Sequence, residues 1–267
     1  AVEIDGRESI VSTLLGKGDS NTKLRKGSGK RYRTVGLSMS PANVGLGNVC
    51  PQASPACRAA CLNETGLGNV LAGVQRGRLA RKLLFYRERE WFLNRLESEL
   101  EQEYAKAKAS RYRLAVRLNV FSDIPWEHFP GLLERFPRVQ FYDYTKNPRR
   151  VGQIAENYLT VFSRSETNEA QALEHLRAGR NVSVVFAELA DNEDRFAGIY
   201  SGRFVGNKAK HQRLPERWCG FPVFDGDQTD LRVTDPQGVV VGLRLKAATT
   251  AKRAAAIDSG FAVKGLV

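Results

Sequence analysis

The spacing of apolar residues predicts two consecutive helices in the first half of the chain. In residues 90–110, apolar side chains recur at intervals of three and four, which places on one helical face Leu93, Leu96, Leu100, Tyr104 and Ala107. The remaining side is expected to face solvent and carries Glu97, Glu99, Glu101 and Glu103. A preceding helix is predicted over 69–86, with a basic face made of Arg76, Arg78, Arg81 and Lys82.

The rest of the chain alternates short apolar runs with helix-like stretches. Strands are predicted over 34–40, 114–121, 139–144, 158–162, 182–186, 221–224 and 239–245, and helices over 127–136, 148–156 and 168–178. Strands separated by helices are typical of parallel βαβ units with right-handed crossovers. We therefore expect an α/β fold, with residues 34–267 forming a single domain. A partial or complete β/α (TIM-like) barrel is the first interpretation, and an open doubly wound sheet is the alternative.

Polar residues inside two predicted strands favour the barrel. Arg117 and Asn119 fall on one face of the strand 114–121, because side chains alternate along a strand. Tyr142 and Tyr144 share a face in the same way in the next strand. A parallel strand covered by helices on both faces would be almost wholly apolar, so these faces are expected to open onto a lumen or cleft. An edge strand with a solvated face is the alternative.

Charged residues follow the predicted strands, at the ends where β/α folds bind ligands. They are Asp123, Lys146, Arg164, Glu166, Asp225 and Asp227. Each could instead cap a helix or stabilise a turn, but together they predict a rim for an anionic ligand. In this interpretation the catalytic residues are Asp123, Glu166 and Lys146, and the substrate-binding residues are Arg117, Asn119, Tyr142, Tyr144, Arg164, Asp225 and Asp227. Lys146 and Arg164 would anchor the anion, and a carboxylate would move protons.

Three of the four cysteines lie close together in a predicted loop over 41–66. Cys50, Cys57 and Cys61 have the spacing C-x6-C-x3-C. A chain of 267 residues can fold without a disulfide or a metal, so the cysteines indicate a site. Thiolates are soft ligands that suit iron–sulfur clusters or zinc. Zinc sites usually use cysteine pairs with two to four residues between them, and the closest pair here is C-x3-C. We expect an iron–sulfur cluster, [4Fe–4S] in type, with zinc or free thiols as alternatives. Cys219 is the only candidate for a fourth thiolate: with it the cluster would be closed, and without it one iron would stay open to a substrate or cofactor.

The charge of the chain adds a prediction about its partner. Lys and Arg number 41 against 29 Asp and Glu, a net charge of +12, which favours a polyanionic partner. Residues 23–33 contain six basic residues and no acidic one, so residues 1–33 are predicted to be a basic N-terminal arm. The arm and the Arg-rich helix are candidate contacts for nucleic acid or a nucleotide, with a solvated loop as the alternative. No apolar run reaches the length of a membrane span, and the start lacks a signal peptide, so we expect a cytoplasmic location.

Several stretches resemble the phage gene product 88-like family, in order over about residues 20–263. They are C-P-x-A-S-P-A-C-x-x-A-C-L-N (50–63), A-V-R-L-N-x-x-S-D-I-P-W-E (115–127), V-Q-F-Y-D-Y-T-K-N-P (139–148), F-S-R-S-E-T-N (162–168) and D-G-D-x-x-D-L-R-x-x-D-P-x-G-V-V-V-G-L (225–243). The resemblance implies a phage-encoded protein, located in the host cytoplasm, with a clustered-cysteine loop. It assigns no catalytic residues, and it favours a three-cysteine site without Cys219.

A barrel with a cysteine loop after its first strand is also similar to radical S-adenosylmethionine enzymes. That resemblance implies S-adenosylmethionine as a cofactor, but those enzymes show C-x3-C-x2-C, and this chain departs from that spacing. The sequence thus predicts an iron–sulfur enzyme that acts on a nucleotide or another anionic substrate derived from nucleic acid. The alternative is a non-enzymatic nucleic-acid-binding protein with a structural iron–sulfur or zinc site.

Overall fold

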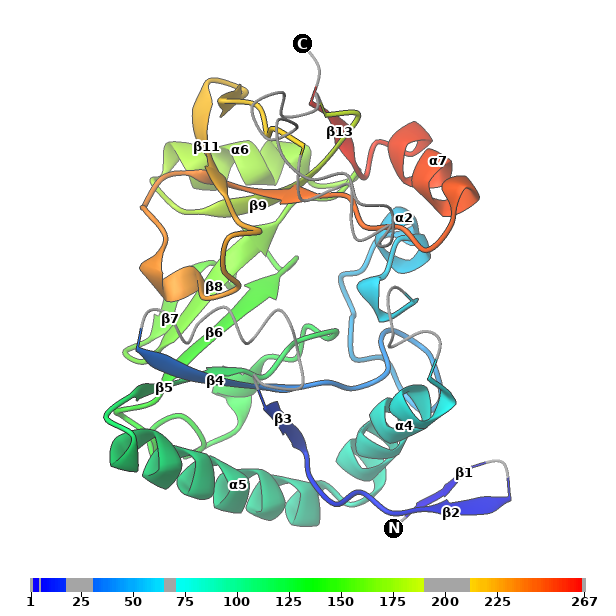
Figure 1. Ribbon diagram of the computed structural model, residues 1–267, viewed down its shortest axis with the longest axis vertical. Helices are drawn as coiled ribbons and strands as arrows, with labels where there is room; N and C mark the ends of the chain where they lie inside the picture. Colours follow the sequence, from blue (N-terminus) through cyan, green and yellow to red (C-terminus); the bar gives the residue numbers. More distant parts are fainter. Residues whose placement is uncertain (1, 5, 18–30, 65–70, 190–211, 266–267) are drawn as a thin grey trace, which may run out of the picture. The chain divides into compact units, whose positions relative to one another are not determined.

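The computed structural model describes residues 2–4, 6–17, 31–64, 71–189 and 212–265 (Figure 1). The chain divides into two compact units, neither of them contiguous in sequence. Unit 1 comprises Ala1–Ala53, Cys61–Phe162 and Thr229–Asp235, and unit 2 comprises Ser54–Ala60, Ser163–Gln228 and Pro236–Val267. The domain boundaries expected from the sequence, 1–33 and 34–267, stay a prediction.

Unit 1 is built on a mostly parallel sheet with the strand order β8-β6-β5-β4-β3. The parallel strands are β4 (Tyr32–Leu37), β5 (Arg113–Arg117), β6 (Gln140–Thr145) and β8 (Tyr158–Ser163). Two antiparallel strands join them, β3 (Leu15–Lys17) on β4 and β7 (Gly152–Ala155) on β8. A separate hairpin consists of β1 (Val2–Ile4) and β2 (Arg7–Ser9).

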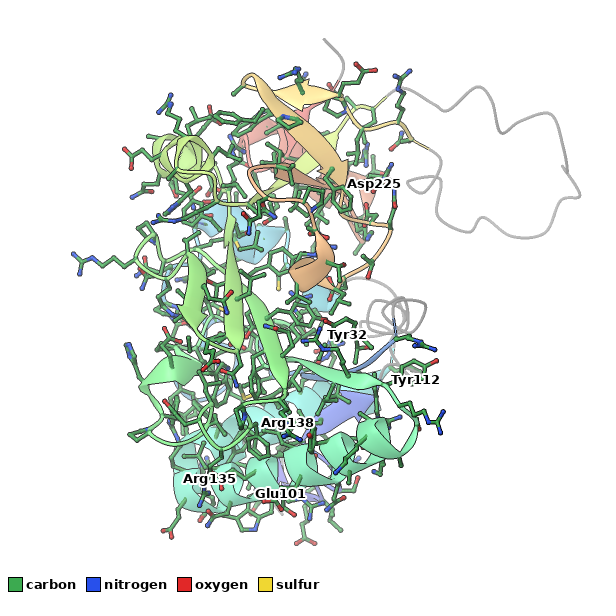
Figure 2. The ribbon with its side chains drawn as sticks, turned by 90° about the vertical axis from the view of Figure 1, so that its left-hand side faces the viewer. Tyr32, Glu101, Tyr112, Arg135, Arg138 and Asp225 are labelled. Atoms are coloured by element: carbon green, nitrogen blue, oxygen red, sulfur yellow. The ribbon has the colours of Figure 1, made fainter. Side chains whose placement is uncertain are left out.

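Two long helices, α4 (Ala72–Arg87) and α5 (Arg89–Ala109), confirm the helices predicted from apolar spacing. Leu96 and Leu100 of α5 are fully buried in the core of unit 1, as expected. The glutamates of α5 do not all face solvent. Glu101 lies on the exposed side of the helix (Figure 2), but Glu99 and Glu103 are buried. Glu99 accepts hydrogen bonds from the backbone amides of Leu14 and Leu15, at 2.9–3.0 Å, and these bonds offset the burial of its charge.

The strands of unit 2 have the order β10-β11-β12-β9 and are again mostly parallel. Its parallel strands are β9 (Val182–Ala187), β11 (Phe221–Asp225), β12 (Val240–Arg244) and β13 (Val263–Lys264), and β10 (Arg217–Trp218) pairs antiparallel with β11. Its helices are the short α2 (Pro55–Ala59), α6 (Glu169–Arg177) and α7 (Thr250–Asp258). Helix α6 confirms the helix predicted over 168–178, and Gly179 follows it with the positive φ of 73° that favours glycine.

The α/β class is confirmed, but the described strands do not close into a barrel. Their order is linear, and the outermost strands β3 and β10 each pair on one side only within the described residues. The expected TIM-like barrel is therefore not found, and an open sheet, the predicted alternative, fits each unit. The polar faces that favoured a barrel have another explanation: residues Thr229–Asp235 pack over them inside unit 1.

Two predicted helices are wrong. Residues 127–136 form only a 3₁₀ turn, Trp126–His128, followed by further turns. Pro130 and Gly131 lie in the middle of this stretch, and the φ of Gly131 is +81°, which ends any helix there. Residues 148–156 contain strand β7 instead, because this stretch pairs with β8, and Gly152 adopts a φ of +98° at its start.

Candidate functional site

The loop that carries the cysteines is bound along helix α4. Lys82 donates from Nζ to the backbone carbonyls of Ala42, at 2.5 Å, and Val44, at 2.8 Å. One turn earlier, Arg78 donates from Nη1 to the carbonyl and side-chain oxygens of Asn63, at 3.2 and 2.8 Å. Because Lys82 and Arg78 are four residues apart, they lie on the same face of the helix. This face fixes both ends of the described part of the loop.

Two glycines let the loop approach α4 closely. A Cβ at Gly47 would lie 2.3 Å from the ring of Tyr86, and a Cβ at Gly45 would lie 2.5 Å from Leu79 Cδ1. Both glycines also have positive φ angles, 68° and 75°, which other residues adopt only with strain. The glycines of this loop are therefore required by its packing, and they hold Cys50 close to the helix.

Lys82 is a buried cation without a carboxylate partner in the described part of the chain. Its exposed fraction is 0%, and it donates hydrogen bonds to two backbone carbonyls, those of Ala42 and Val44. Burial lowers the pKa of Lys82, and the thiolate of Cys50 opposes that shift. A buried charge is unfavourable unless a counter-charge compensates it. Cys50 is the neighbouring group whose ionisation would supply that counter-charge.

Cys50 and Cys61 each have a cation of α4 beside them. Cys50 Sγ lies 3.3 Å from the amide of Ala42, which donates to it, and 3.3 Å from the carbonyl of Phe121, to which the thiol donates. Arg78 stacks over the Phe121 ring at 4.4 Å. Burial and the neighbouring Arg81 lower the pKa of Arg78, and Cys61 opposes this effect. Positive charge near thiols favours their thiolate form.

The three cysteines are divided between the units: Cys50 and Cys61 belong to unit 1, and Cys57 belongs to unit 2. Cys57 lies in α2, where its amide donates to the capping Ser54 Oγ at 3.2 Å. Across the described residues, no three or more His, Cys, Asp or Glu side chains are grouped so that they could hold a metal ion. The donor chemistry nevertheless suits an anionic cluster, because the soft thiols of Cys50 and Cys61 have the cations Lys82 and Arg78 as neighbours. Cys219 is exposed.

Arg117, Tyr142 and Tyr144 come together in unit 1. Arg117 forms an ion pair with Asp230, 2.7 Å from Nη1 to Oδ2, and its guanidinium lies 4.7 Å from the centroid of the Tyr144 ring. Tyr142 is fully buried and packs with Leu231 of the covering segment. The sequence did not reveal Asp230 as the partner of Arg117, because 113 residues separate them.

Asn119 does not share a face with Arg117, contrary to the alternation argument. Strand β5 ends at Arg117, so the strand period no longer applies two residues later. Asn119 instead receives hydrogen bonds at Oδ1 from the amide of Ile124 and from Trp126 Nε1, at 2.9 and 3.2 Å. Its backbone amide donates to Asp143 Oδ1 at 2.7 Å. Asn119 thus organises the turn after β5, a role that offers no open contact for a substrate.

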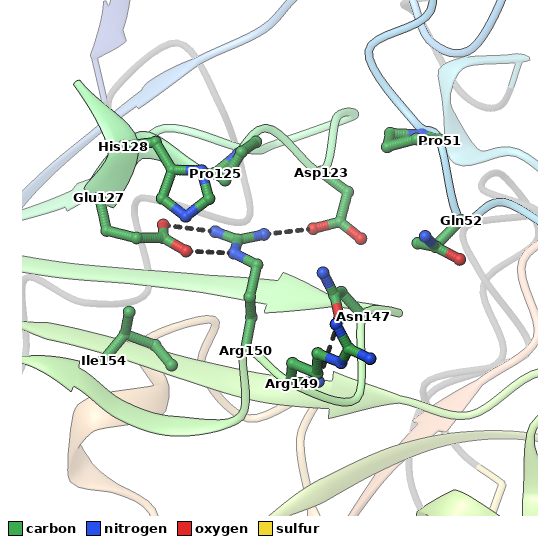
Figure 3. Close-up of a pocket in the computed structure, with 10 residues that line it drawn as sticks. All are labelled: Pro51, Gln52, Asp123, Pro125, Glu127, His128, Asn147, Arg149, Arg150 and Ile154. Carbon is green, nitrogen blue, oxygen red and sulfur yellow. Dashed lines mark hydrogen bonds and ion pairs between the residues drawn. The ribbon is translucent and has the colours of Figure 1, made fainter.

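Asp123 lies in an open pocket of about 470 Å³ (Figure 3). The pocket is lined by Pro51, Gln52, Asp123, Pro125, Glu127, His128, Asn147, Arg149, Arg150 and Ile154. Arg150 bridges the two carboxylates, at 2.8 Å to Asp123 and through two nitrogens to Glu127. The backbone amide of Lys146 donates to the other oxygen of Asp123 at 2.9 Å. Burial raises the pKa of Asp123, but both of its oxygens already accept hydrogen bonds.

The remaining predicted residues belong to unit 2 and hold its loops. Glu166 accepts from Ser54 Oγ and from the amide of Ala56, at 2.8 and 3.1 Å, and so binds the start of α2. Arg164 donates to the carbonyl of Phe261 at 3.1 Å. A second group of ion pairs joins Asp225 and Asp227 with Arg244 and Lys246. Burial opposes ionisation of Asp227, but Lys246 and Arg244 hold its pKa below the usual value. The predicted catalytic and binding roles of these residues stay predictions.

On helix α4, three of the four basic residues predicted to contact nucleic acid make internal hydrogen bonds. Arg78 and Lys82 bind the cysteine loop, and Arg81 donates to the carbonyl of Thr13 at 3.0 Å, so most of the basic face of α4 points inward. In the predicted N-terminal arm, residues 18–30 lie outside the described residues. Among the helices that the structure describes, none is long and apolar enough to cross a membrane.

These observations define an α/β protein of two units with a cysteine loop bound to a helix of the first unit and buried ion pairs beside its central strands. The family model Gene product 88 matches residues 13–265. The chain therefore belongs to the Gene product 88 family, a family of phage gene products, as its motifs predicted. A search of curated proteins found no match, and a search of solved structures found none.

Proposed function

We propose that this phage protein binds an iron–sulfur cluster, [4Fe–4S] in type, through Cys50, Cys57 and Cys61. The observation that carries the proposal is Lys82: a fully buried lysine beside Cys50 that has no carboxylate partner among the described residues. A cluster held by thiolates is anionic, and it would supply the counter-charge that Lys82 requires. Arg78 would contribute in the same way beside Cys61.

The spacing of the loop favours iron–sulfur chemistry over zinc only through Cys50. Cys57 and Cys61 form a C-x3-C pair, which lies within the spacing usual for zinc, whereas six residues separate Cys50 from Cys57, more than zinc pairs usually have between them. The amide of Ala42 donates to Cys50 Sγ, and hydrogen bonds of this kind to sulfur tune the potential of iron–sulfur clusters. Ligation would replace the contact between the Cys50 thiol and the Phe121 carbonyl, because a thiolate has no proton to donate.

The cluster is tested by purifying the full chain without oxygen and measuring iron, acid-labile sulfide and absorbance near 400 nm. We expect iron and sulfide in the wild type, and a loss of both in Cys50→Ala, Cys57→Ala and Cys61→Ala. Cys219→Ala, an exposed cysteine, serves as the matched control and is expected to keep the cluster. A colourless wild type that contains stoichiometric zinc would contradict the proposal.

Lys82→Met tests the role of the buried cation directly. The substitution keeps the length of the side chain and removes its charge, so the cluster is expected to be lost faster under a chelator. Arg76→Met, on the same helix but outside the contacts that bind the loop, is the control. Equal rates of cluster loss in the two variants would show that Lys82 does not stabilise the cluster.

We further propose that the protein is an enzyme of the radical S-adenosylmethionine kind, acting on a nucleotide or a related anionic substrate. Arg117, Tyr142 and Tyr144 in unit 1 support this, because they place a guanidinium and a phenol hydroxyl side by side. Within unit 1, Lys146 would anchor the anion, while Asp123 would move a proton. Cleavage of S-adenosylmethionine by the reduced holoprotein is the assay, and its absence from a preparation with full iron content would contradict the enzymatic proposal.

The net charge of +12 favours a second candidate, a non-enzymatic nucleic-acid-binding protein with a structural metal. Binding through phosphates weakens steeply with salt. Two results would contradict binding of nucleic acid through the basic arm. One is an affinity for nucleic acid that depends only weakly on salt, and the other is an affinity that removal of residues 1–33 leaves unchanged.

A further inference from the structure

The side chains of Arg117 and Tyr142 are adjacent because of the register between β5 and β6. Ala115 pairs with Gln140 and Val116 with Phe141, and the same register places Arg117 next to Tyr142. Side chains two apart on a strand share a face, so Tyr144 follows on the same side. The guanidinium of Arg117 and the ring of Tyr144, 4.7 Å apart, confirm that this face is shared.

Two polar atoms on this face have no hydrogen-bond partner among the described residues. They are Arg117 Nε and Tyr142 Oη, and both are completely buried. Buried polar groups in proteins are almost always paired, so two unpaired donors in one place require an explanation. Asp230 and Arg117 are the first charged groups to influence the Tyr142 hydroxyl. Both unpaired donors therefore lie around the same ion pair.

Asp230 occupies the site incompletely. Its Oδ2 accepts from Arg117 Nη1 at 2.7 Å, while Arg117 Nε makes no hydrogen bond. Arginine favours two parallel hydrogen bonds to a carboxylate or a phosphate, and this pair makes one. A tetrahedral oxyanion has enough oxygens to accept from Nη1, from Nε and from the Tyr142 hydroxyl together. The site is thus better matched to a phosphate group than to the carboxylate that now contacts it.

Asp230 belongs to a segment, Thr229–Asp235, that has several contacts within itself. The buried Arg232 donates to the carbonyls of Thr229 and Asp230 and pairs with Asp235 at 3.1 Å. Leu231 packs on Tyr142 and its neighbours. Because the internal bonds of the segment do not depend on Arg117, withdrawal of Asp230 from Arg117 would leave them intact.

We propose that Arg117 and Tyr142 form a binding site for a phosphate group, and that Asp230 is an internal competitor for it. The choice of an anionic ligand rests on the proposed function, but the site itself does not involve the cysteine loop. If the purified protein binds phosphate but contains no iron, only the proposed cluster is contradicted. If it contains iron but does not bind phosphate, only the proposed phosphate site is contradicted.

The experiment measures binding of inorganic phosphate to the full-length protein by calorimetry. Asp230→Asn removes the competing charge, and we expect it to bind phosphate at least tenfold more tightly than the wild type. Adding Arg117→Met to that variant is expected to abolish binding. If Asp230→Asn binds phosphate with the same affinity as the wild type, the proposal is overturned.

Tyr142→Phe separates a ligand site from a merely structural one. Removing an unpaired buried hydroxyl is expected to raise the melting temperature without phosphate, and to weaken phosphate binding in the Asp230→Asn background. If Asp230→Asn fails to fold, Tyr142→Phe is compared with the wild type instead: phosphate should raise the melting temperature of the wild type more than that of the variant. Equal effects of phosphate on both proteins would overturn the proposal.

Discussion

Asp143 is a buried carboxyl whose proton is coupled to folding. Its exposed fraction is 1%, and it accepts hydrogen bonds from the amide of Asn119 at 2.7 Å and from Tyr158 Oη at 3.0 Å. Burial raises its pKa from 3.8 to about 7, although Arg117 and Arg150 favour the charged form. We therefore predict that replacing Asp143 by Asn changes how the free energy of unfolding depends on pH.

The direction in which the free energy of unfolding changes with pH follows from the protonation of Asp143 in the folded and unfolded states. Between about pH 4 and pH 7 the unfolded chain has released a proton that the folded protein keeps. The stability linked to Asp143 is thus fully present below about pH 4 and is lost as the pH rises to about 7. At about 1.4 kcal/mol per pH unit, the loss reaches at most about 4 kcal/mol. Asparagine does not titrate, so Asp143→Asn removes this dependence.

Urea unfolding of the wild type and of Asp143→Asn measures the effect at several pH values. The free energy of the variant, relative to the wild type, should rise by about 3 kcal/mol between about pH 4.5 and pH 7.5. Asp258→Asn, at the exposed end of α7, is the control for an ordinary carboxylate. A difference between wild type and Asp143→Asn that stays constant with pH would refute the reasoning.

Three further substitutions test the contacts that hold unit 1 together. Asn119→Ala leaves the amide of Ile124 and Trp126 Nε1 unpaired in the core, so urea unfolding should show a loss of at least about 3 kcal/mol; a loss below about 1 kcal/mol would contradict the network. Glu99→Gln weakens the charge-assisted bonds to the amides of Leu14 and Leu15 by about 1.5–3 kcal/mol, and hydrogen exchange at these two amides should speed up while that of β6 stays unchanged. Gly47→Ala forces a methyl group into the Tyr86 ring and should lower the melting temperature more than Gly131→Ala. Gly131 is the control because its φ is similar but the space around it is open. Equal changes in melting temperature would contradict the close packing of the loop on α4.

The sequence predicted best those features that depend on local spacing. The period of three and four along α5 and the apolar runs of β4, β5 and β6 identified these elements, because burial repeats along each of them at short range. The helix expected over 127–136 failed where Pro130 and Gly131 broke the backbone pattern. Short pieces such as β13 and α2 were not predicted, since two to five residues carry no measurable period.

The sequence singled out candidate site residues but revealed few of the contacts that they make. The cysteines and Arg117 stood out because their chemistry is unusual for a loop or for a buried strand. Lys82, however, was assigned to a basic face of the helix, and nothing in its local spacing shows that its side chain is fully buried and donates to loop carbonyls. The pairing of Arg117 with Asp230 depends on a contact across 113 residues, which short-range patterns do not encode.

In the sequence, each unit is interrupted by a short segment that belongs to the other unit, and this limits how the gene can be divided. Ser54–Ala60 of unit 2 lies between two parts of unit 1, and Thr229–Asp235 of unit 1 lies between two parts of unit 2. A single cut in the coding sequence therefore cannot release either unit intact: a fragment starting at Ser163 would keep Glu166 and lose Ser54, and the other fragment would keep Arg117 and lose Asp230. A break in the gene at Ser163 is therefore expected to leave each fragment without one side of a contact made inside its own unit.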